Sequence, residues 1–176
     1  MLEELRLTIE LVPSTCWFNN LRTRIPRVAW DKLRKKVYAQ YHHRCALCQA
    51  ANVCLNCHEI WQYDDTLYFQ KLEGFMALCE MCHHCKHMGK AALLARAGKL
   101  DIEKVIDHFM RVNQCSREVY EEHARQAWDT WKARSEHEWT TELGAFAHLV
   151  QPTRESIQYV TVFDRVHNIE RQVRIV

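Results

Sequence analysis

The sequence predicts an α+β fold, in which a small β-hairpin core follows an N-terminal strand and a basic helix and precedes appended C-terminal helices. Two observations predict it. Cysteine pairs flank residues 57–72, which are rich in aromatic and β-forming side chains, and the neighbouring segments carry apolar residues at helical spacing. Only seven of the 176 residues are Gly or Pro and 48% are hydrophobic, so the chain is expected to fold. We divide it into segments 1–40, 41–98, 99–150 and 151–176.

The first segment predicts one strand and one main helix. Leucine and isoleucine alternate along residues 5–11, which is typical of a half-buried strand, and Pro13 ends it. A short helix is expected near Ser14. Beyond Pro26, apolar residues recur every three or four positions and predict a helix whose buried face carries Trp30, Leu33, Val37 and Tyr41.

Charge is unevenly distributed, although the net charge of the chain is only +2. Residues 21–44 contain eight Lys or Arg against one acid, whereas residues 116–142 contain seven acids against four bases. A basic surface suits an anionic partner such as a phosphate backbone. The expected nucleic-acid contacts are Arg22, Arg24, Arg27, Arg34, Lys35 and Lys36.

The sequence also indicates a compartment. No apolar run has the roughly 18 residues that a membrane span needs, and the acidic N-terminus does not resemble a signal peptide, so we expect a cytoplasmic protein without a membrane partner. Because thiols stay reduced in the cytoplasm, nine cysteines indicate metal binding rather than disulfides.

Two Cys-x-x-Cys pairs, Cys45/Cys48 and Cys79/Cys82, have the spacing of a structural zinc site. Zinc prefers four soft ligands in a tetrahedron, and each pair supplies two thiolates. Cys54/Cys57 and Cys82/Cys85 have the same spacing and compete as pairings. We prefer the first register because it leaves the hairpin intact, so that Cys54 and Cys85 are spare thiols or part of a second site.

The later segments predict helices and a final pair of strands. A helix over 83–97 closed by Gly98 would place His83 and His87 one turn apart, as a metal chelate. Further helices are expected over 102–112 and 117–138, with Asp101 and Ser116 as N-caps. We expect Trp128, Trp131 and Trp139 to be core residues rather than a base-stacking surface. The tail predicts two strands that turn near Asn168.

The stretches "CALC", "CHEIW" and "MALCEMCHHCKH" resemble the zinc-containing HNH, or ββα-metal, endonuclease family over about residues 41–90. The stretches "LVPSTCWFNNLRTRIP", "YDD" and "KHMGKA" resemble an uncharacterised bacterial and phage branch of that family, which suggests a phage or defence role. The resemblance implies a four-cysteine zinc beneath a hairpin and helix that hold a catalytic divalent metal ion.

The resemblance also implies roles for individual residues. His58 corresponds to the general base, and His83 and His87 to ligands of the catalytic metal. Cys57 stands where the family has Asp or His, which makes it a third expected ligand and favours zinc or nickel over magnesium, with manganese also considered. Gly74 stands where the family has an Asn.

The expected function is therefore hydrolysis of phosphodiester bonds in DNA, with RNA as an alternative substrate. A second interpretation is a non-catalytic zinc module that binds nucleic acid or protein. That module would need the cysteines but not the histidines. A third is a thiol redox sensor that uses the surplus cysteine pairs. The C-terminal helices could form a scaffold, a homodimer interface or a docking surface for a larger complex.

Overall fold

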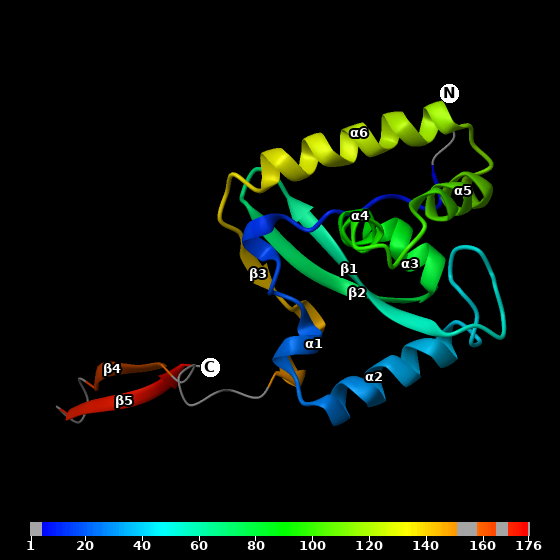
Figure 1. The fold of residues 1–176 in the computed structure, drawn as a ribbon. Helices are drawn as coiled ribbons and strands as arrows, with labels where there is room; N and C mark the ends of the chain where they lie inside the picture. The colour runs from blue at the N-terminus through cyan, green and yellow to red at the C-terminus, as the bar shows by residue number, and fades with distance from the viewer. Residues whose placement is uncertain (1–4, 151–157, 165–168, 176) are drawn as a thin grey trace.

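The hairpin expected at the centre of the chain is present in the computed structural model, which describes residues 5–150, 158–164 and 169–175. Strands β1 (Leu55–Asp64) and β2 (Phe69–Cys79) pair antiparallel from Leu55 opposite Cys79 to Asp64 opposite Phe69 (Figure 1). The Asp64 carboxylate closes the turn by accepting the backbone N–H groups of Thr66 and Leu67, both at 2.9 Å. The predicted α+β class is confirmed.

A β-bulge changes which side chains of the hairpin face each side of the sheet. Ile60 lies opposite Gly74 and Trp61 opposite Leu72, so Glu73 is the extra residue of β2. Because alternation shifts by one at the bulge, Leu72 and Phe75 pack on the same face. The apolar face that carries Leu72 and Phe75 is therefore continuous across the bulge.

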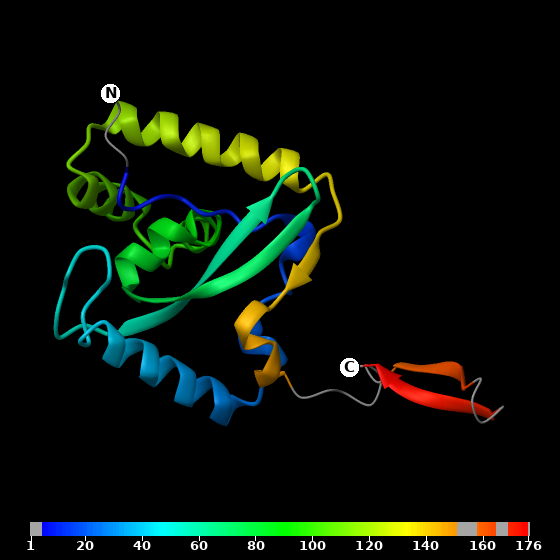
Figure 2. The same ribbon diagram turned by 180° about the vertical axis from the view of Figure 1, so that it is seen from behind.

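The two faces of the hairpin pack against different parts of the chain. One face packs on α2 (Arg27–Gln40), whose predicted buried residues Trp30 and Val37 join Phe75 in the smaller core cluster. The other face packs on α3 (Glu80–Lys86), α4 (Met88–Arg96) and α5 (Ile102–Asn113), which form the larger cluster. Figures 1 and 2 show α2 on the opposite side of the hairpin from these helices.

The prediction of a single helix over 83–97 is wrong, because the helical segment is broken at His87. This residue has φ −100° and ψ 51° and separates α3 from α4. The carbonyl of Lys86 accepts the N–H of Glu10 at 2.8 Å, so it is used outside the helix. Gly98 closes α4 with a φ of +67°, as expected.

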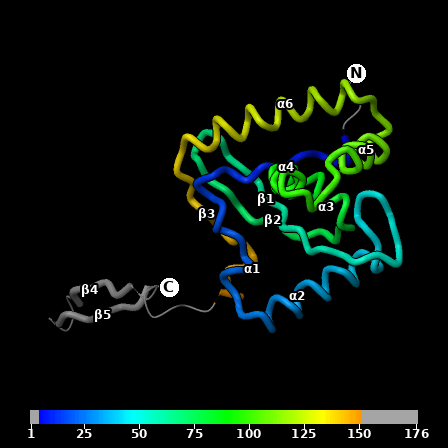
Figure 3. Tube along the Cα trace, in the orientation of Figure 1, coloured from blue at the N-terminus to red at the C-terminus, as the bar shows by residue number. Residues whose placement is uncertain are grey.

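The strand predicted over residues 5–11 is also wrong, although the alternation of burial is as expected. Leu7 and Ile9 are buried, but the segment joins no sheet. Side chains hold its backbone instead: Asn113 bonds both the N–H and the carbonyl of Leu7, and His123 accepts the N–H of Ile9. The segment therefore runs beside α5 and α6 (Arg117–Arg134), as the trace in Figure 3 shows.

The helices after the hairpin follow the predicted order with different ends. Asp101 caps α5 by accepting the N–H of Glu103 at 3.1 Å. The Ser116 side chain makes no cap bond to the backbone, and α6 ends at Arg134 rather than at residue 138. Three short elements were not predicted: α1 (Leu21–Arg24), β3 (Thr140–Glu142) and η2 (Gly144–Leu149). The short helix expected near Ser14 is present as the 3₁₀ helix η1 (Ser14–Cys16).

The remaining elements are short strands that follow α6. Strand β3 adds to β2 in parallel, which gives the order β1-β2-β3. The predicted strand pair of the tail is present as β4 (Gln158–Asp164) and β5 (Ile169–Ile175), which form a separate antiparallel sheet, and the expected turn at Asn168 lies outside the described residues. Within the described residues, every helix is too short or too polar to cross a bilayer.

Candidate metal centres

Four cysteine sulfurs meet at the base of the hairpin. The Sγ atoms of Cys45, Cys48, Cys79 and Cys82 all lie within 4.8 Å of one another. Those of Cys48 and Cys79 are 3.6 Å apart. A tetrahedron with zinc–sulfur bonds of about 2.3 Å separates its sulfurs by about 3.8 Å. The cluster is therefore compatible with a structural zinc ion, and it uses the register that the sequence analysis preferred.

Local backbone structure brings the two pairs together. Gln49, at φ +61°, turns the chain back after Cys48 and donates its N–H to the carbonyl of Cys45 at 3.0 Å. Cys79 ends β2 and caps α3, where its sulfur accepts the N–H of Cys82 at 3.5 Å. One pair thus precedes the hairpin and the other follows it, so a shared ion would fasten both of its ends.

A histidine that the sequence analysis did not consider contacts this cluster. His108 on α5 has its Nε2 3.1 Å from the sulfur of Cys82, and Arg111 donates to its Nδ1 at 2.9 Å. Because Arg can only donate, Nδ1 is the acceptor and the ring proton lies on Nε2. Burial lowers the pKa of His108 and keeps the ring neutral. An N–H group aimed at sulfur stabilises a thiolate, the form that binds metal.

The surplus thiols lie outside the four-sulfur cluster. Cys54 is exposed, and buried Cys85 donates its thiol to the carbonyl of Val105 at 3.3 Å. Burial raises the pKa of Cys85 to about 12, which keeps it protonated. Neither residue joins the cluster.

Three histidines form a second group beyond the cysteines. One side-chain nitrogen each of His58, His83 and His87 lies within 4.8 Å of the others, and His58 Nδ1 is 3.1 Å from His87 Nε2. Two nitrogens on one tetrahedral zinc, with bonds of about 2.0–2.1 Å, would be about 3.3 Å apart. His83 and His87 stay close across the helix break, with ring centres 4.6 Å apart, so the nitrogens of the group are close enough to hold one metal ion. The same spacing also suits two ligands with a base beside them.

Burial keeps two of these imidazole rings neutral. Desolvation by burial, with a smaller contribution from the cation Lys90, lowers the pKa of His83 to about 4 and that of His87 to about 3. Both rings are therefore neutral at physiological pH. A neutral imidazole nitrogen is the form that coordinates a metal ion.

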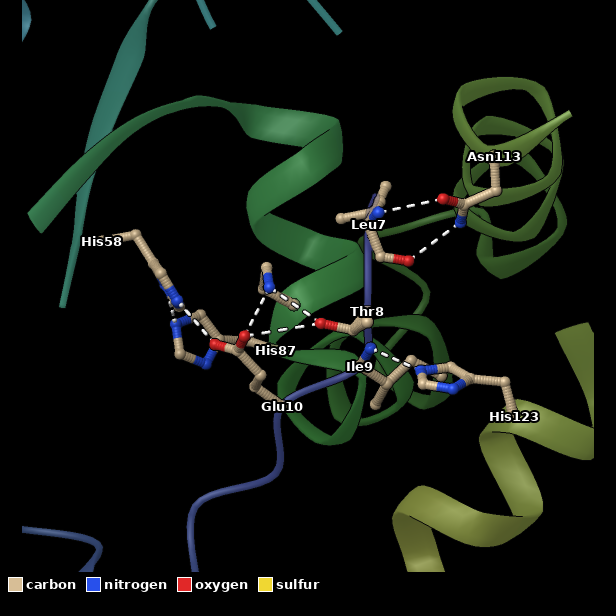
Figure 4. Close-up of polar contacts among 9 residues, drawn as sticks. Leu7, Thr8, Ile9, Glu10, His58, His87, Asn113 and His123 are labelled. Atoms are coloured by element: carbon tan, nitrogen blue, oxygen red, sulfur yellow. Dashed lines mark hydrogen bonds and ion pairs between the residues drawn. The ribbon is translucent and has the colours of Figure 1, made fainter. Parts of the chain in front are cut away.

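The third histidine, His58, is held by Glu10, which belongs to the N-terminal segment (Figure 4). Its carboxylate lies 3.0 Å from Nε2 of His58, a side chain only 3% exposed, and also pairs with the ammonium of Lys86, which is 4% exposed. Thr8 accepts a further bond from Lys86 at 2.9 Å. Burial opposes ionisation of Glu10, but the bonds from His58 and Lys86 and the charge of Lys86 outweigh it and lower the pKa to about 2.

The ionised Glu10 fixes the tautomer of His58. A carboxylate can only accept, so Nε2 of His58 carries the proton and Nδ1, 3.1 Å from Nε2 of His87, is the acceptor nitrogen. No local pattern in the sequence indicates this contact, because Glu10 lies at an outward position of the alternating pattern and His58 follows 48 residues later. Only the path of the N-terminal segment brings them together.

Cys57, the third ligand expected for the catalytic metal, does not join the histidines. Successive residues of a strand point to opposite faces, so Cys57 turns toward α2 and packs against the smaller core cluster while His58 turns toward α3. Burial raises the pKa of Cys57 to about 12. The nearby Gly74 has room for a side chain, because an added Cβ would meet no atom within 4 Å.

The histidines open into a cavity of about 730 Å³ that lies between α1, α4 and α6. A smaller cavity of about 440 Å³ adjoins it across Glu10 and His58. The walls of the larger cavity are partly aromatic and partly cationic, with Trp17, Trp61, Trp128, Arg22, Lys90 and Arg96 among its lining residues.

Of the six basic residues expected to contact nucleic acid, only Arg22 lines this cavity. Arg24 follows it on α1, whereas Arg27, Arg34, Lys35 and Lys36 belong to α2, which packs on the opposite face of the hairpin from the histidines. Arg34 is paired with Asp31 at 2.7 Å. The structure does not bring the α2 cations to the histidine group.

Comparisons with protein-family models, curated proteins and solved structures found no match to this chain. What the protein does must therefore be inferred from its own residues.

Proposed function

We propose that the protein is a metal-dependent endonuclease of the HNH type that hydrolyses phosphodiester bonds in DNA. The observation that carries the proposal is the convergence of His58, His83 and His87 at the junction of a hairpin and the helix that follows it, directly beside a four-cysteine cluster. A structural zinc module needs only the cysteines. Three convergent histidines that open into a cavity need a chemical reason of their own.

The proposal assigns each histidine a part in hydrolysis. His83 and His87 would hold a divalent cation, which supplies charge neutralisation for the phosphate and the leaving oxygen. With Cys57 turned away, the ligands are imidazoles, which suit zinc or nickel better than magnesium or manganese. His58 takes a proton from the attacking water at Nδ1, and Glu10, bonded to Nε2, stabilises the imidazolium that forms.

Cleavage of supercoiled plasmid tests the proposal. The zinc-loaded protein is incubated with Mg²⁺, Mn²⁺, Ni²⁺ or Zn²⁺, beside His58→Ala, His83→Ala and the exposed control His148→Ala. We expect nicking by the wild type and the control, and a loss of about 10²–10⁴-fold in His58→Ala. The metal content of each variant distinguishes a metal ligand from a general base. His83→Ala should lose the added metal, whereas His58→Ala should keep it.

Two outcomes would overturn the proposal. Nicking that survives both His58→Ala and His83→Ala would place the activity elsewhere. Absence of cleavage of both the plasmid and a single-stranded DNA circle with every metal, for a protein that holds its cysteine-bound zinc, would favour the non-catalytic zinc module.

A further inference from the structure

We propose that this site acts on single-stranded nucleic acid, whose bases stack on tryptophans in the larger cavity. The inference rests on the proposed function and specifies the substrate of that site. It is carried by a separate observation, namely what surrounds the histidines.

Exposed tryptophans line the cavity that holds the histidines. Trp17, in the loop after η1, is 50% exposed, and Trp128 on α6 is 39% exposed. Trp128 packs beside Gly89 of α4 and edge-on against Trp131, which fixes its position. The expectation that Trp128 is a core residue is therefore wrong, whereas Trp139 is buried as expected. Large aromatic rings that are open to solvent and grouped in one cavity mark a binding site, and they suit a ligand with flat apolar faces.

Cations accompany these rings. Arg22 from α1 and Lys90 and Arg96 from α4 line the same cavity, and none of the three forms an ion pair with another residue that the structure describes. The two acids of the cavity already accept hydrogen bonds from the protein. Glu10 pairs with Lys86, and Glu59 accepts the backbone N–H of Arg22 and the indole N–H of Trp61. The cavity therefore combines aromatic faces with unpaired positive charge.

A nucleic-acid strand with unpaired bases matches both features. Its bases offer apolar faces and its phosphates offer negative charge, and stacking on aromatic side chains contributes about 1–3 kcal/mol per base in proteins that bind single strands. A duplex buries its base faces inside the helix, so it would leave Trp17 and Trp128 without a partner. The cations of α2, on the far face of the hairpin, would be reached only by a longer strand.

Binding is measured with full-length His58→Ala, so that the probe stays intact. The probes are a fluorescent DNA strand of about 20 nucleotides, the RNA strand of the same sequence, and the DNA duplex, each followed by anisotropy. We expect the single strands to bind at least about tenfold more tightly than the duplex. Adding Trp17→Ala or Trp128→Ala should weaken single-strand binding about 5- to 150-fold.

Matched variants separate stacking from damage to the fold. Phe18→Ala removes a neighbouring aromatic ring that is 83% exposed and lies outside the cavity lining, so it should leave affinity unchanged. Trp17→Phe keeps a stacking face and should retain most of the affinity. Lys90→Ala should weaken binding and reduce its salt dependence, since one phosphate contact is lost.

The outcomes distinguish this inference from the proposed function. Equal affinity for strand and duplex, with no effect of either tryptophan variant, would overturn the inference, and nicking of duplex plasmid would then still support the endonuclease. Tryptophan-dependent binding of single strands without any cleavage would support the inference and contradict the catalytic role. Preference between the DNA and RNA strands identifies the sugar of the substrate.

Discussion

The contact between Glu10 and His58 is the smallest feature on which the proposed chemistry depends. A base that must accept a proton at Nδ1 needs its other nitrogen protonated and held. Glu10 does both, and Lys86 keeps that carboxylate ionised. A group that acts in this way is a positioning residue, because it acts through the base.

Glu10→Ala is expected to lower kcat about 10- to 100-fold, because the tautomer and orientation of His58 are no longer fixed. The amide oxygen of Glu10→Gln can still accept the Nε2–H of His58, so the kcat of this variant should lie between those of the wild type and Glu10→Ala. Nitrogen chemical shifts of the His58 ring report the tautomer independently of turnover, and they should show a single Nε2–H form in the wild type but a mixture of tautomers in Glu10→Ala. Glu73→Ala, which removes an exposed acid paired with Lys71, is the control. An unchanged ring spectrum in Glu10→Ala would contradict the assignment.

His108 is expected to play a comparable part at the cysteine cluster. Its Nε2–H group points at the sulfur of Cys82, and such partners typically contribute about 10- to 100-fold to metal affinity. His108→Ala should therefore release zinc faster to a chromogenic chelator, whereas His108→Gln, which keeps a side-chain donor, should release it more slowly than Ala. If zinc release from His108→Ala matched the wild type, the bond would have no role in metal retention.

At the scale of elements, the sequence predicted best where the signal is local. The hairpin, α2 and α5 follow from periodicity, turn residues and an Asp cap within one stretch of chain. The sequence could not show that the Lys86 carbonyl would bond Glu10, so the helix break at His87 was missed. The four-cysteine group was predicted because Cys-x-x-Cys spacing marks the candidate pairs, and only one choice of pairs leaves the hairpin intact between them. Glu10 and His108 were missed because tertiary packing alone brings them to the sites.

Arg134 joins the end of α6 to the tip of the hairpin. Its guanidinium forms two bonds with Asp65, at 2.6 and 2.7 Å, and lies 4.4 Å from the ring centre of Tyr63. This contact closes the aromatic wall of the smaller cavity, where Tyr63 and Arg134 both lie.

Arg134→Ala should lower the free energy of unfolding by about 1–2 kcal/mol, since a two-bond ion pair and a cation–π contact are lost together. Urea unfolding measures the loss, and hydrogen exchange should show faster exchange at the end of α6. Arg125→Ala, on the same helix, removes only exposed pairs with Glu122 and Asp129 and should change stability little. Equal effects of the two substitutions would show that Arg134 does not fasten the helix.

At the scale of the whole molecule, the cysteine cluster lies inside the larger core rather than on its edge. That core draws Leu7 and Ile9 from the N-terminal segment, Cys45, Cys79 and Cys82 from the hairpin ends, and Phe109 and Tyr120 from α5 and α6. Three of the four predicted segments therefore share one core. A substitution in the cysteine cluster should therefore disturb the packing of all three segments.

Removal of zinc is accordingly expected to unfold the hairpin and the helices together. Metal binding contributes about 10–16 kcal/mol in zinc-finger peptides, whereas a whole domain is stable by only about 5–15 kcal/mol. Cys45→Ser should abolish zinc binding and the cooperative thermal transition, followed by metal analysis and circular dichroism. Cys54→Ser, which changes an exposed thiol outside the cluster, should preserve both. Because protons compete with zinc for thiolates, the wild type should lose metal and structure together as the pH falls. A zinc-free protein that still melts cooperatively would show that the apolar contacts of the larger core are sufficient, and that the metal serves another purpose than folding.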